Sequence, residues 1–109
     1  MDRKTFESVR DNLLKEAIEV SKAKGKDYSR DNVDVLYNFK SVASRLGISS
    51  LQSHMIYMMK HQDAIENYVK SQGKSESEPI RQRIIDNINY LTFLYGLLID
   101  EGFEDDTNI

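Results

Sequence analysis

Acidic side chains spaced along helical stretches are the residues of this sequence best suited to chemistry. Asp63 and Glu66 lie three residues apart, and Asp86 falls inside the apolar run "RIIDNINYL" at residues 83–91. Acids three apart project from neighbouring points of a helix, and their oxygens are suitable ligands for Mg²⁺. Two such groups on facing helices would hold Mg²⁺, neutralise phosphate charge and position a water for attack. Phosphate chemistry is therefore the first hypothesis.

Each of these acids also has a purely structural interpretation. Asp63 suits a solvated helix surface, as do Glu16 and Glu19 on an earlier helical stretch. A buried Asp86 is costly unless it is paired. Arg83, one turn earlier, or an arginine of another helix would be a suitable partner. The sequence leaves these alternatives open.

Lysines, aromatic rings and amides are the residues that suit a phosphate and a base. The tract "KGKDY" offers Lys24 and Lys26 as a charge clamp beside the ring of Tyr28. Candidate substrate-binding residues elsewhere in the chain are Asn38, Phe39, Lys60, Arg83 and Asn89. In this hypothesis the cations hold phosphate oxygens, the amides read polar edges and the rings stack on the base.

Helical periodicity runs through the first half of the chain and predicts two helices there. One apolar face of the first helix contains Phe6, Val9, Leu13, Ala17 and Val20. Gly25 is expected to end this helix, with an irregular polar segment after it. A second apolar stripe runs from Val35 to Leu46, and Gly47 is expected to end that helix.

Two more helices are predicted in the second half. Ser49 and Gln52 have the spacing of a capping box for a third helix at about residues 50–70. Pro79 suits the first turn of a fourth helix, which is expected to run to about Glu101. The prediction is an all-α, four-helix domain.

Length and composition bound the class of protein. The 109 residues indicate one domain, 1–102, followed by an acidic tail at 103–109. A net charge of −3 with dispersed lysines and arginines disfavours nucleic acid and anionic membranes as partners. The absence of cysteine excludes disulfides and thiolate metal sites, and His54 and His61 are interpreted as surface or interface residues. Without a signal-like or membrane-spanning segment, a cytoplasmic location is expected.

The predicted fourth helix is apolar on two nearly opposite sides. One face contains Ile84, Ile88, Leu91, Tyr95 and Leu98. The other contains Asp86, Tyr90, Phe93 and Leu97. A helix apolar on two sides is either central to a large core or shared with another subunit. In so short a chain, the second explanation predicts a homo-oligomer, a dimer or a tetramer.

Four tracts in order along the chain carry a family resemblance: "KGKDY", "NFK", "MMKHQDAI" and "EPIRQRIIDNINYL". This set resembles small phage and prophage proteins of the nucleotide-modification-associated kind. Those proteins are similar to the all-α, MazG-like NTP pyrophosphohydrolase superfamily. The resemblance spans roughly residues 10–100 and implies an oligomeric, MazG-like helical bundle. It also implies hydrolysis of (d)NTPs to a monophosphate and pyrophosphate, with Mg²⁺ as cofactor.

The superfamily holds Mg²⁺ with an E-x-x-E pair on one helix and an E-x-x-D pair on another. By position, Asp63 and Glu66 match the first pair and Asp86 matches the final aspartate. The resemblance therefore implies these three as catalytic residues and metal ligands. The glutamate expected three residues before Asp86 is Arg83 in this chain. An arginine there matches phosphate directly.

Three functions are consistent with the sequence. The first is a Mg²⁺-dependent (d)NTP pyrophosphohydrolase. The alternative is a non-catalytic protein of phage origin that binds and sequesters a nucleotide or nucleotide-derived signal, favoured if Arg83 replaces a metal-binding carboxylate. The third is a helical adaptor whose apolar stripes bind another protein.

Overall fold

The computed structural model describes residues 1–29, 34–74 and 78–105, without the side chains of residues 26–29. Within these ranges the chain forms four α-helices and no strand, which confirms the predicted all-α class. The helices are α1 (Arg3–Ser29), α2 (Tyr37–Leu46), α3 (Ser50–Lys70) and α4 (Ile80–Asp100). None of these four helices has both the length and the apolar character that crossing a membrane requires.

Local signals at the helix ends explain most of these bounds. Gly47 follows α2 with a φ of 68°, a left-handed conformation that glycine adopts without strain. The Ser49 hydroxyl accepts a hydrogen bond from the backbone N–H of Gln52, and the Gln52 side chain accepts one from the Ser49 N–H. This confirms the predicted capping box. Pro79 immediately precedes α4, and Gly102 follows it with a φ of 82°.

The predicted end of the first helix was wrong. Gly25 lies inside α1, which continues to Ser29. Its φ is not in the positive region that the glycines after α2 and α4 occupy. A glycine in a helix interior costs only about 1 kcal/mol, so packing of α1 against α4 is enough to carry the helix through it. Part of the tract expected to be irregular is therefore helical.

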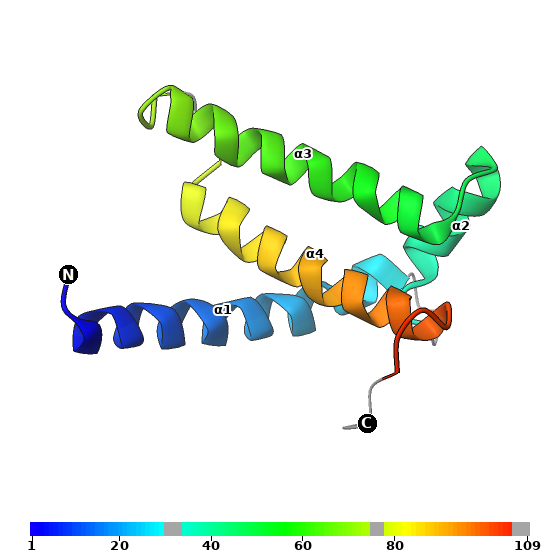
Figure 1. Cartoon of the computed structure of the whole chain (residues 1–109), viewed down its shortest axis with the longest axis horizontal. Coiled ribbons are helices and arrows are strands. Elements are labelled where there is room, and N and C mark those ends of the chain that lie inside the picture. Colours follow the sequence, from blue (N-terminus) through cyan, green and yellow to red (C-terminus); the bar gives the residue numbers. More distant parts are fainter. Residues whose placement is uncertain (30–33, 75–77, 106–109) are drawn as a thin grey trace.

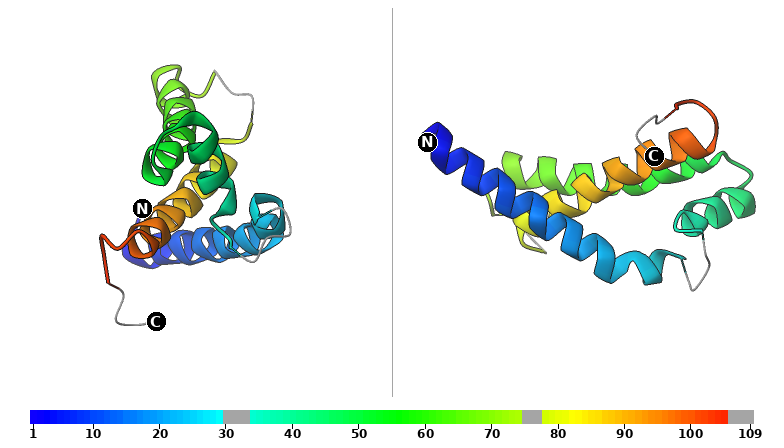
Figure 2. Two further views of the ribbon diagram at one scale, coloured as in Figure 1. Left: turned by 90° about the vertical axis from the view of Figure 1, so that its right-hand side faces the viewer. Right: turned by 90° about the horizontal axis from the view of Figure 1, so that it is seen from below.

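The helix α4 lies at the centre of the molecule. Figure 1 shows it running between α3 and α1, and the two views of Figure 2 agree. It packs against both of them, whereas α2 packs against α3 and α1. Among the described residues, α1 and α3 share no contact with each other. The arrangement is an open helical bundle held together by its last helix.

The core gathers around the ring of Phe39, which is fully buried. It consists of Leu36, Phe39, Tyr90 and Leu97, with Leu51, Tyr57, Met58 and Phe93 packed against it. The Phe39 ring meets those of Tyr57, Tyr90 and Phe93 at centroid distances of 5.5 to 6.1 Å. The Asp86 face of α4 therefore supplies the core, and its opposite face points outward.

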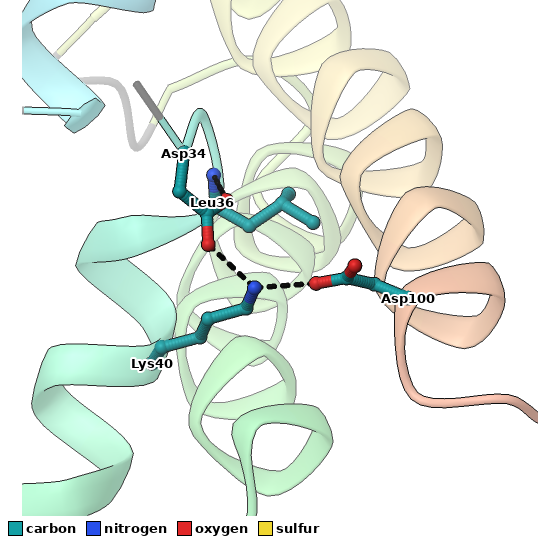
Figure 3. Close-up of polar contacts among 4 residues, drawn as sticks. All are labelled: Asp34, Leu36, Lys40 and Asp100. Atoms are coloured by element: carbon teal, nitrogen blue, oxygen red, sulfur yellow. Dashed lines mark hydrogen bonds and ion pairs between the residues drawn. The ribbon is translucent and has the colours of Figure 1, made fainter. Parts of the chain in front are cut away.

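A lysine joins α2 to the end of α4. The Lys40 ammonium lies 2.5 Å from Asp34 Oδ2 and also pairs with Asp100, as Figure 3 shows. Asp34 in turn accepts a hydrogen bond from the backbone N–H of Leu36 at 2.9 Å. These contacts raise the pKa of Lys40, and the lysine lowers the pKa of Asp34. The three charges form a clasp between two elements far apart in the sequence.

Candidate functional site

Asp86 is the buried carboxylate around which a site can be built. It is 8% exposed and lies on the core side of α4. The side-chain amide of Gln82, one turn earlier, donates a hydrogen bond to its Oδ1 at 3.1 Å. The Lys24 ammonium, from α1, lies 3.6 Å from the same oxygen. The carboxylate is therefore neutralised by a cation from another helix.

A small pocket opens beside this ion pair, between α1 and α4. Its volume is about 10 Å³, which is room for about one water molecule. The residues that line this α1–α4 pocket are Val20, Ser21, Lys24, Asp86, Asn89 and Phe93. Three of them were predicted as site residues, and the structure brings Lys24, Asp86 and Asn89 together. The pocket is far smaller than the 300–1,000 Å³ typical of sites for drug-sized ligands, so it has room for a single small polar group at most.

Asn89 has a structural as well as a binding aspect. It is buried on α4, and its side-chain Nδ2 donates a hydrogen bond to the backbone carbonyl of Ala17 at 3.0 Å. This bond ties α4 to α1 directly below the pocket. This bond uses one of the two N–H donors of the amide, so the second N–H and the acceptor Oδ1 remain for a ligand.

Arg83 does not provide the cation closest to Asp86. Its Nε lies 3.7 Å from Glu78 Oε2, and its side chain is largely buried. Burial is the largest influence on the pKa of His61 and lowers it. The charge of Asp86 raises this pKa, and the charge of Arg83 lowers it. Arg83 thus lies within the electrostatic surroundings of Asp86, while Lys24 makes the ion pair.

The acids predicted on α3 lie elsewhere. Asp63 and Glu66 are exposed, as is Lys60. Within residues 1–25, 34–74 and 78–105, no three histidine, aspartate or glutamate side chains are placed to hold one metal ion. Asp63, Glu66 and Asp86 are therefore not brought together as a ligand set in a single chain. The residues present do not fit the Mg²⁺ site that the resemblance implies.

Two predicted ligand contacts are core contacts instead. Phe39 was expected to stack on a base, but its ring is enclosed by other aromatic rings and has no free face. Asn38 is half-buried, and its Nδ2 lies 3.5 Å from the Tyr57 hydroxyl. Both residues belong to the packing of α2 on α3. Phe39 also belongs to the apolar stripe between Val35 and Leu46, and this periodicity indicates a core position.

The remaining predicted residues have separate positions. The predicted contacts of Lys26 and Tyr28 lie outside the part of the structure that is described with side chains. Glu16 pairs with Arg81 of α4 at 2.6 Å, and Glu19 is exposed. Glu16 therefore helps to join α1 to α4.

Sequence reasoning missed the burial of His54. Predicted at a surface or interface, it is fully buried between Phe39 and Tyr90. Its Nε2 lies 2.6 Å from the Tyr90 carbonyl oxygen. A carbonyl only accepts, so Nε2 carries a proton and donates it to this oxygen. Burial lowers the pKa of His54.

Comparisons with known proteins add no relative. No known protein family matches the chain, and no curated protein or solved structure is significantly similar to it. The resemblance to the MazG-like superfamily therefore stays a prediction that rests on the sequence motifs.

Proposed function

We propose that this protein binds a nucleotide, or a signal derived from one, at the α1–α4 pocket without hydrolysing it. The observation that carries the proposal is the Lys24 ammonium 3.6 Å from the buried Asp86 carboxylate. A cation of the protein itself neutralises the one predicted metal ligand that is buried. This charge balance favours capture of an anionic ligand without a metal ion.

The groups around the pocket suit different parts of such a ligand. Lys24 is half-exposed on a flexible stem, so its ammonium can turn from Asp86 to a phosphate oxygen. Asp86 and Asn89 Oδ1 are acceptors, which match the N–H groups on the edge of a base. Val20 and Phe93 provide apolar walls. One polar group of the base edge would enter the pocket, and the rest of the nucleotide would lie outside it, with the phosphates past Lys24 in solvent.

Calorimetry with a panel of nucleoside mono-, di- and triphosphates and cyclic nucleotides tests this proposal. Titrations are made in EDTA and repeated with Mg²⁺, and the ligand is then recovered and analysed by chromatography. Binding of equal strength in both buffers, with the ligand unchanged, is the expected result. If no member of the panel binds or shifts the melting temperature, the nucleotide proposal fails and the adaptor interpretation replaces it.

Replacing Lys24 with methionine should weaken binding while keeping the length of the side chain. A hydrogen bond to a charged group contributes about 1.5–3 kcal/mol, so the Kd should rise about 10- to 100-fold. Lys22→Met is the matched control, because Lys22 is an exposed cation on the same helix. Equal effects of the two variants would show that only general charge matters and would contradict a site at Lys24.

Hydrolysis is the outcome that would favour the other function. Release of monophosphate and pyrophosphate with Mg²⁺, lost in Asp86→Asn but not in Lys22→Met, would identify a pyrophosphohydrolase. Asp63→Asn and Glu66→Gln then ask whether the exposed acids of α3 take part, which would require a second subunit or another conformation to bring them to Asp86.

We also propose that the chain is a MazG-like bundle that works as a homo-oligomer. The support for the bundle is its all-helical architecture in four elements. The support for an oligomer is that large apolar side chains remain exposed on all four helices, among them Ile18, Leu46 and Leu91. A chain that functions as a monomer would be expected to expose fewer large apolar side chains.

A further inference from the structure

The outward face of α4 is an uninterrupted apolar stripe. It consists of Ile84, Ile88, Leu91, Tyr95 and Leu98. Ile84, Leu91 and Tyr95 are 36%, 50% and 46% exposed, and the other two are half-buried. Between Arg83 and Asp100 the sole charged residue of α4 is Asp86, which faces the core. This α4 outer stripe therefore presents no charge to solvent along most of the helix.

The spacing of the stripe is that of a helix-pairing seam. Its members follow one another at intervals of four, three, four and three residues, the pattern by which two helices interlock side chains along a shared contact. The exposed apolar residues of α3 do not continue in this way, because Met55 and Met59 are followed along their face by Gln62 and Glu66. The α4 outer stripe keeps this spacing over five successive members.

The dimensions of the chain match those of a subunit better than those of a compact monomer. A compact monomer of 12.6 kDa exposes about 6,200 Å², whereas this chain exposes 7892 Å². Its radius of gyration is 15.8 Å, compared with about 13 Å for a compact domain of this length. A stable interface needs about 800 Å² from each partner. The surplus surface is enough for one.

We infer that a second copy of this chain packs on the α4 outer stripe, with the two α4 helices antiparallel about a two-fold axis at Leu91. Such an axis sets Ile84 against Leu98 of the partner subunit and Leu91 against Leu91 of the partner subunit. It also brings Arg81, which pairs with Glu16 of its own chain, near Glu101 of the partner subunit. Antiparallel helix dipoles add to this complementarity.

The α4 outer stripe would be the contact surface of the proposed homo-oligomer, whether or not the protein binds a nucleotide. The stripe and the pocket lie on opposite sides of α4, so the second copy leaves the pocket open. In a two-fold contact the same surface of each subunit must fit itself. A stripe whose members are spaced evenly on both sides of Leu91 meets this requirement.

Sedimentation equilibrium of the wild-type chain and of Leu91→Glu tests the inference. The wild type should be a dimer, and the variant should be a monomer with a dimer Kd raised at least 100-fold, because two carboxylates would face each other across the axis. Leu91 is half-exposed in the single chain, so circular dichroism should show the same helix content. Ile56→Glu, on the exposed face of α3, is the matched control and should remain dimeric.

A mixing experiment decides whether position 91 meets itself. Leu91→Glu and Leu91→Arg should each be monomeric alone and should form a heterodimer when combined. Because the chain has no cysteine, Leu91→Cys should also form a disulfide-linked dimer under mild oxidation, while Ile56→Cys should not. A dimeric Leu91→Glu overturns the α4 surface alone, whereas a wild type that is monomeric at all concentrations overturns the oligomer as well. Nucleotide binding to the same variants, measured by calorimetry, tests the nucleotide proposal independently of both outcomes.

Discussion

Gly25 and Gly47 are the same residue type in two backbone conformations, and substitution should separate them. Gly25 lies in the interior of α1, where an added Cβ would meet no atom within 4 Å. Gly25→Ala should therefore raise the free energy of unfolding by about 0.5–1 kcal/mol. Gly47 has a φ of 68°, so Gly47→Ala should lower it by about 1–2 kcal/mol. Urea denaturation followed by circular dichroism measures both, and a loss of stability in Gly25→Ala would contradict the continuous helix.

At the residue scale, sequence patterns predicted helix caps better than the partners of side chains that pair between helices. The Ser49 and Gln52 cap depends on residues three apart, so local spacing was sufficient. The pairing of Lys24 with Asp86 joins α1 to α4 and depends on how two distant helices pack, which no local pattern records. Arg83 was the nearer candidate in sequence, but its side chain lies toward Glu78. His54 was missed for the same reason, because its burial results from the approach of α2 and α4.

At the scale of elements, the clasp of Lys40 with Asp34 and Asp100 joins α2 to the end of α4. All three side chains are partly exposed, so each ion pair contributes modestly, and Lys40→Met should lower the free energy of unfolding by about 1 kcal/mol. The loss should shrink in high salt. Urea denaturation of Lys40→Met, Asp100→Asn and the double variant forms the test. Additive effects of the two substitutions would show that the two groups do not interact.

Periodicity predicted the helices because each has an apolar face, and it predicted that α4 has two. It did not predict which face would be buried. Both faces of α4 are suitable for a core, and the choice follows from α1 and α3 packing on neighbouring sides of it. The predicted face of α1 shows the same limit, since Ala17 is buried while Phe6 and Val9, nearer the end that projects past α4 in Figure 1, are exposed.

At the scale of the whole molecule, two histidines should make stability depend on pH. Burial lowers the pKa of His54 and of His61 below the ordinary value of 6.5. Below that pH the unfolded chain takes up protons that the folded chain does not, so the free energy of unfolding should be constant from pH 8 to 7 and fall as the pH drops from 6.5 to 5. The slope is at most about 1.4 kcal/mol per pH unit for each histidine.

Urea denaturation at several pH values measures this slope, and His54→Gln separates the contributions. Glutamine keeps a donor for the Tyr90 carbonyl but does not titrate in this range. The variant is expected to be less stable at neutral pH and to lose less stability on acidification. A slope identical to that of the wild type would show that His54 does not contribute to it.

The central position of α4 has a consequence for how the protein is made. This helix is synthesised after the other three, yet both α1 and α3 pack against it. Isolated helices are only marginally stable in water, so the first three have little to hold them while the ribosome is still adding α4. The helices α1 and α3 can therefore pack only once α4 has been synthesised, and a polypeptide that lacked α4 would expose its apolar faces and be a substrate for proteases.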